Sequence, residues 1–116
     1  MIRENVQKLY KGDTLVLPIE VTDDNDLPVN ITGGVLSFTA KLPADLWQPD
    51  NVAVLSTDVM VHTDPTKGKS LVMIGEEFTA DVDIGRYKYD VQLTLNGVVT
   101  TILVWDLEVL QSVTER

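Results

Sequence analysis

Few side chains in this sequence could do chemistry. The chain has a single histidine, His62, and no cysteine. A Ser-His-Asp triad or a histidine metal site would therefore have to include His62, and thiolate catalysis and cysteine zinc sites are excluded. Because His62 ends an apolar run just before Asp64 and Pro65, we interpret it as an exposed residue at a strand end. The sequence therefore predicts no catalytic residue and no enzyme activity.

The carboxylates do not follow the spacing of a metal site. Residues 22–26, Thr-Asp-Asp-Asn-Asp, begin like a calcium loop, but Pro28 and Gly34 occupy the positions where such a loop needs Gly and Glu. We interpret this segment as a solvated hairpin turn. Asp81 and Asp83 are two residues apart, and we interpret them as exposed loop acids. We therefore expect no metal site and no cofactor.

Tyr87 and Tyr89 alternate with Arg86 and Lys88. Such interleaving of basic and aromatic residues could bind single-stranded nucleic acid by stacking. Strand alternation, however, places both rings on the face of Val91, opposite the basic residues. We therefore predict that the two tyrosines pack in the core.

The two tryptophans are better candidates for contact with a partner. Trp47 lies in an irregular segment between Pro43 and Pro49, where it could anchor a partner or fold back to cap the core. Trp105 lies in a strongly apolar run, where it could be core or half-buried at an assembly face. Both alternatives remain open for each residue at this stage.

The charge balance argues against several partners. The chain of 116 residues has 18 acidic and 9 basic residues, a net charge of −9, which disfavours nucleic acid and anionic membranes. No run approaches the roughly 20 apolar residues of a membrane span, and the N-terminus lacks the apolar core of a signal peptide. We expect no nucleic-acid, membrane or small-molecule partner, whereas a basic protein partner remains compatible with the charge.

The sequence predicts that β-strands position these residues. Short alternating runs separated by turn residues predict an all-β sandwich or barrel, and the length suits one domain spanning residues 1–116. The expected strands cover residues 4–10, 14–21, 35–41, 52–62, 70–75, 84–95 and 98–110. Pro18 points outward in its strand, which predicts a sheet edge or a bulge there. Phe78 and Val82 are expected to fill the edge of the core.

The last two strands form the clearest local unit. Asn96-Gly97 is typical of a type I′ hairpin turn, because that turn needs positive φ at both central residues. The returning strand is apolar on both faces, with Ile102 and Val104 on one and Leu103 and Trp105 on the other. Such a strand is central in its sheet or meets a partner.

Several motifs together resemble a known family. They are Gly12-Asp13, Pro28-Val29, Ile31-Thr32-Gly33, Gly85-x-Tyr87-x-Tyr89-Asp90 and Val113-Thr114. They resemble small immunoglobulin-like domains of tailed-bacteriophage virion proteins, of the upper-baseplate or fibre N-terminal type or of the capsid-decoration type. Asp26 stands where the family pattern has a turn glycine, and Trp105 stands where a small residue is common.

The resemblance implies an immunoglobulin-like β-sandwich of seven to eight mostly antiparallel strands. It also implies a non-enzymatic structural component of the virion (baseplate, neck, head fibre or capsid decoration), assembled in the host cytoplasm, that docks onto other virion proteins or onto copies of itself. The candidate contacts are Val6, Leu9, Tyr10, Trp47 and Trp105. The alternative is a module that binds a host-surface saccharide by stacking on Trp47 or Tyr10.

Overall fold

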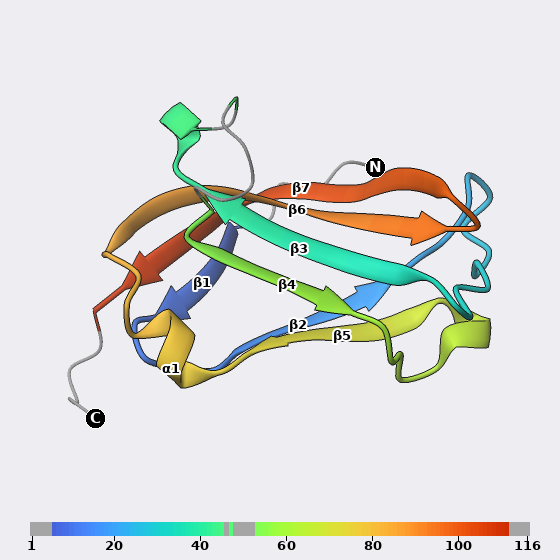
Figure 1. Cartoon of the computed structure of the whole chain (residues 1–116), viewed down its shortest axis with the longest axis horizontal. Helices are drawn as coiled ribbons and strands as arrows, with labels where there is room; N and C mark the ends of the chain where they lie inside the picture. The colour runs from blue at the N-terminus through green and yellow to red at the C-terminus, as the bar shows by residue number, and fades with distance from the viewer. Residues whose placement is uncertain (1–5, 46, 48–52, 112–116) are drawn as a thin grey trace.

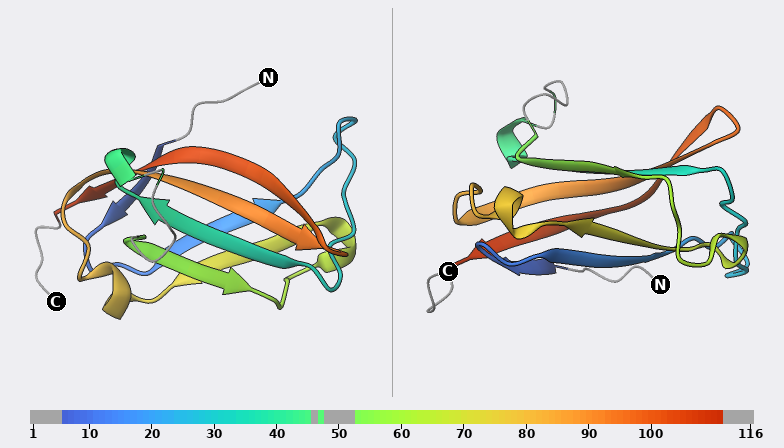
Figure 2. Two further views of the ribbon diagram at one scale, coloured as in Figure 1. Left: turned by 45° about the horizontal axis from the view of Figure 1, so that its top comes forward. Right: turned by 60° about the horizontal axis from the view of Figure 1, so that its bottom comes forward.

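The computed structural model describes residues 6–45, 47 and 53–111. These residues form an all-β sandwich of two facing sheets (Figures 1 and 2), as predicted. One sheet has the strand order β1-β7-β6-β3-β4, and the other pairs β2 with β5. The strands are β1 (Val6–Tyr10), β2 (Leu15–Glu20), β3 (Val35–Lys41), β4 (Leu55–Val59), β5 (Lys69–Ile74), β6 (Gly85–Leu95) and β7 (Val98–Leu110). Short helical turns η1 (Pro43–Asp45), η3 (Pro65–Lys67) and α1 (Glu76–Thr79) lie in the connections.

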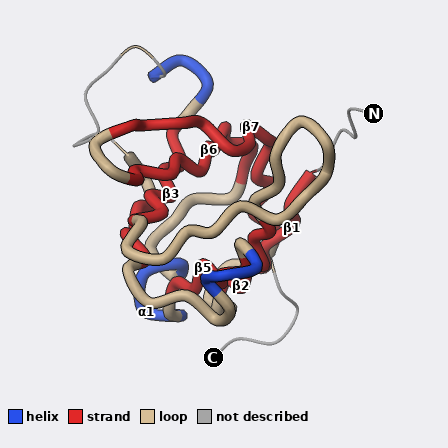
Figure 3. The backbone as a smooth tube through the Cα atoms, turned by 90° about the vertical axis from the view of Figure 1, so that its right-hand side faces the viewer, coloured by secondary structure: helices blue, strands red, loops and turns tan. Residues whose placement is uncertain are grey.

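The pairing is antiparallel except between the first and last strands. β1 runs parallel to β7, from Val6 opposite Asp106 to Tyr10 opposite Leu110. Figure 3 shows the molecule from one end, with β3, β6 and β7 opposite β2 and β5 and with β1 at the side. The seven strands described agree with the predicted number and with mostly antiparallel pairing, while the immunoglobulin-like topology remains a prediction.

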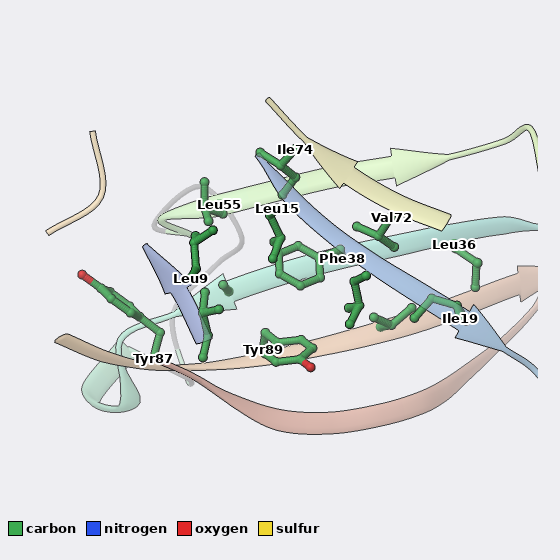
Figure 4. Close-up of a cluster of buried hydrophobic side chains, with 14 of the residues drawn as sticks. Leu9, Leu15, Ile19, Leu36, Phe38, Leu55, Val72, Ile74, Tyr87 and Tyr89 are labelled. Carbon is green, nitrogen blue, oxygen red and sulfur yellow. The ribbon is translucent and has the colours of Figure 1, made fainter. Parts of the chain in front are cut away.

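Period-two alternation builds the core between the sheets. Leu15, Leu17 and Ile19 of β2 are buried, and the residues between them are exposed. Tyr87 and Tyr89 of β6 are also buried, which confirms their prediction as core residues (Figure 4). The alternation follows from the strand geometry, which turns successive side chains to opposite faces.

Two local predictions from turn chemistry and proline are also confirmed. β2 belongs to a two-stranded sheet, so it is an edge strand, and Pro18 is exposed there. Asn96 and Gly97 have φ values of 52° and 78°, as a type I′ turn requires. Asp26, which replaces the expected turn glycine, has a positive φ of 61°.

The prediction that Phe78 fills the core edge is wrong. Its side chain is 61% exposed, whereas Val82 is buried as predicted. α1 has only one turn, and it buries Thr79, whose hydroxyl donates a hydrogen bond to the carbonyl oxygen of Asp13 at 2.6 Å. This contact turns the Phe78 side of the helix toward solvent.

Candidate functional site

The three candidate contacts on β1 fall on opposite faces of that strand. Val6 and Tyr10 are 41% and 48% exposed, whereas Leu9 is only 3% exposed. Leu9 belongs to the core cluster, where a partner of the folded protein cannot reach it. Val6 and Tyr10 therefore remain as candidate contacts on this strand, and Leu9 is removed because alternation turns it inward.

The two tryptophans have different surroundings. Trp47 is 95% exposed, so it does not cap the core. Trp105 is half-buried against the core, edge-on to Tyr89 with ring centroids 6.4 Å apart. Trp105 lies on β7 beside β1, whereas Trp47 follows β3, and β6 and β7 lie between β3 and β1. The candidate residues are thus divided between at least two surfaces.

β7 changes its surroundings halfway along its length. β6 pairs along one side of it, and β1 covers the other side only from Asp106 to Leu110. No described strand pairs with that second side over residues 98–105. Among the described residues, β7 therefore has strands on both sides over residues 106–110 and on one side only over residues 98–105.

Residues 98–105 of β7 are uncharged and mostly apolar, with Thr100 and Thr101 as the polar residues. Val98, Val99 and Val104 are 63%, 59% and 62% exposed, and residues 95–104 include no charged side chain. Edge strands in natural proteins usually carry charges or proline, because unpaired backbone groups recruit other chains. Residues 98–105 contain neither a charge nor a proline. They do contain a β-bulge at Ile102, between the pairs Val91–Leu103 and Gln92–Thr101, and a bulge also disturbs strand addition. The sequence pointed to Trp105 but missed Val98 and Val99, although the long neutral run was visible.

A polar pocket lies on the outer face of the five-stranded sheet. It has a volume of about 290 Å³ and is lined by Thr39, Lys41, Lys88, Tyr89, Asp90, Gln92 and Val104. Lys88 forms an ion pair with Asp106 of the neighbouring strand. Alternation explains this composition, because the polar residues of β3 and β6 all face outward. Such a pocket can supply hydrogen bonds to a polar ligand.

His62 is not the exposed residue that the sequence predicted. Its ring is half-buried, with Nε2 2.7 Å from the carbonyl oxygen of Gly34 and Nδ1 2.8 Å from Oγ of Ser70. Because a carbonyl oxygen can only accept, Nε2 donates the proton of that hydrogen bond, and Nδ1 pairs with the serine hydroxyl. His62 thus links the start of β3 to β5, and both of its nitrogen atoms are engaged in the fold.

The acidic segments form turns. Oδ1 of Asp23 accepts hydrogen bonds from the backbone amides of Asn25 and Leu27, at 2.8 and 3.0 Å, which confirms the predicted turn. Asp81 and Asp83 are exposed. Within residues 6–45, 47 and 53–111, no group of three or more His, Asp or Glu side chains is arranged to hold a metal ion.

The two buried tyrosines differ in their hydroxyl groups. The Tyr87 hydroxyl donates a hydrogen bond to the carbonyl oxygen of Asp83 at 2.7 Å, whereas the Tyr89 hydroxyl has no partner among the described residues. Burial raises the pKa of both side chains above the ordinary value, and the nearby Asp83 carboxylate also raises the pKa of Tyr87. Both therefore remain protonated and neutral at physiological pH.

The described residues form a small β-sandwich with an exposed tryptophan and with one side of β7 that no other described strand pairs over residues 98–105. No protein-family model and no curated protein sequence matches the chain. In the described part of the chain, none of the helices is long and apolar enough to cross a membrane.

Proposed function

We propose that this protein is a non-enzymatic structural component of a tailed-bacteriophage virion that docks onto other virion proteins. The resemblance of its turn and strand motifs to immunoglobulin-like virion domains supports the virion setting. Baseplate, neck, head fibre and capsid decoration are the locations that this resemblance implies. Docking is supported by the exposed apolar surface of the sandwich.

The observation that carries the proposal is the neutral side of β7 over residues 98–105, which pairs with no other described strand. An extended strand of a neighbour can add to such an edge through backbone hydrogen bonds, and alternate side chains then select the partner. Val98, Val99 and Val104 offer apolar contacts on the two faces of this strand. Val6, the first described residue of β1, lies opposite Asp106 and therefore close to this stretch of β7.

The proposal is tested by mass spectrometry of purified virions from the phage or prophage that encodes the protein. We expect the protein in stoichiometric amounts, and its absence would overturn the proposal. Incorporation of Val99→Lys should fall by about tenfold or more, because a charge on an edge opposes strand addition. Val61→Lys is the matched control, because Val61 is 88% exposed outside any strand. Equal incorporation of the two variants would reject the β7 edge as the docking surface.

A saccharide-binding module remains the second candidate, and two observations favour it. Trp47 is 95% exposed, as a sugar-stacking side chain would be, and the sheet carries a polar pocket of about 290 Å³. A glycan array should then give a signal for the wild-type protein that Trp47→Ala abolishes. An array with no signal, or equal binding by the variant, excludes this function.

A further inference from the structure

Two strand edges border a groove on one side of the sandwich. Among the described strands, β4 pairs only with β3, and β5 pairs only with β2. A groove of about 480 Å³ lies between them, with residues 53–57 on one wall and residues 73–75, Phe78 and Asp81 on the other. Figure 1 shows α1 following the end of β5 on this side of the molecule. The groove therefore opens where the two sheets separate.

The floor of this groove is apolar, and its rim carries exposed apolar side chains. Leu55 and Ile74 are 4% and 5% exposed, and Figure 4 shows both within the core cluster. Met73 and Phe78 are 54% and 61% exposed. A large aromatic residue beside an apolar floor is the kind of surface that a partner covers on binding.

The rim is also acidic. Glu76, Glu77, Asp81 and Asp83 are all exposed, and none of them belongs to an ion pair of the described chain. Asp81 lines the groove directly. The Glu77 carboxylate lies close to Gly75. A Cβ atom built on Gly75 would be only 2.6 Å from Oε2 of Glu77. No lysine or arginine occurs between Lys69 and Arg86, so no basic residue of this segment offsets the charge.

We propose that this groove is a second docking site, which takes an extended segment of another protein with alternating apolar residues flanked by Lys or Arg. The unpaired strand edges favour an extended backbone, the floor selects apolar side chains, and the carboxylates select basic flanks. A second copy of this chain is a poorer occupant, because two chains of charge −9 repel each other.

This inference does not depend on the partner being a virion protein. A display library of short random peptides, selected against the wild-type protein, provides the probe. We expect enriched peptides to share alternating apolar residues with Lys or Arg at the flanks. Their binding should weaken by about tenfold or more in Phe78→Glu and Asp81→Lys, and it should also weaken as salt is added.

The matched control is Val61→Glu, which adds the same charge at a residue that is 88% exposed and does not line the groove. It should bind the enriched peptides as the wild type does, and thermal melting checks that each variant is folded. No enrichment, acidic flanks in the enriched peptides, or equal binding by Phe78→Glu would overturn the proposal. Concentration-dependent dimerisation that Phe78→Glu abolishes would assign the groove to a second copy, and it would overturn the proposal as well. None of these results bears on the β7 edge or on the presence of the protein in virions.

Discussion

Replacing Tyr89 with phenylalanine should make the protein more stable. The Tyr89 side chain is 2% exposed, and its hydroxyl has no hydrogen-bond partner in the described part of the chain. Phenylalanine keeps the ring and therefore its contacts with Phe38 and Trp105, whose ring centroids are 5.2 and 6.4 Å away. The substitution removes only the oxygen atom that is buried without a partner.

The expected gain follows from the cost of that burial. A buried hydroxyl without a partner costs roughly 1–3 kcal/mol of stability. The small void left by removing one oxygen atom costs only about 0.5 kcal/mol. The free energy of unfolding should therefore rise by about 1 kcal/mol. Tyr87→Phe is the matched control on the same strand, because it removes a hydroxyl bonded to the carbonyl oxygen of Asp83 at 2.7 Å. That variant should lose about 1 kcal/mol, so the two changes should have opposite signs.

Urea denaturation followed by tryptophan fluorescence measures both variants. With a slope of about 2 kcal/mol per molar urea, the two transition midpoints should differ by about 1 M, with the wild type between them. A Tyr89→Phe variant that loses as much stability as Tyr87→Phe would refute the reasoning. It would mean that the Tyr89 hydroxyl has a bonding partner, such as an ordered water molecule.

Three further predictions concern stability. Gly68→Ala should lose about 2–4 kcal/mol in denaturation, because Gly68 has φ +70° and a Cβ atom would lie 2.5 Å from a backbone carbonyl oxygen. Gly12→Ala, at φ +89° with nothing within 4 Å, should lose only about 1 kcal/mol, and equal losses would contradict the steric argument. Thr79→Val should lose about 1–2 kcal/mol, because it leaves the carbonyl oxygen of Asp13 without its 2.6 Å donor, and an unchanged midpoint would reject that role. Stability should fall above about pH 10, where the unfolded chain releases tyrosine protons that burial retains in the folded state, by up to about 1.4 kcal/mol per pH unit for each such tyrosine. Titration of unfolding should show a shallower fall in Tyr89→Phe, whose wild-type side chain has a raised pKa, and an unchanged slope would contradict this.

Much of the fold could be predicted because its signals are local. Leu15, Leu17 and Ile19 show their buried face through a period of two, which a single strand imposes on its own residues. Asn96 and Gly97 show the hairpin because few residues adopt positive φ. These signals need no knowledge of which strands lie beside one another.

The errors occur where a distant contact decides the outcome. Phe78 is apolar, yet a hydrogen bond from Thr79 to the distant turn at Asp13 orients the one-turn helix and leaves Phe78 exposed. His62 ends a strand, yet its ring links Gly34 to Ser70, both remote from it in the sequence. No local pattern could indicate either contact.

The candidate surfaces divide in the same way. The sequence by itself determined which side chains are apolar. It also determined that residues 95–104 carry no charge and that the segment with Glu76 and Asp81 is acidic. Only the tertiary structure decided that the described part of β1 covers β7 over residues 106–110, and that β4 and β5 border a groove beside the acidic segment. The physical reason is that an edge or a groove is a property of strand pairing across the chain. The alternation of residues assigns each side chain to a face of its strand, but the neighbouring strands decide whether that strand has an open edge.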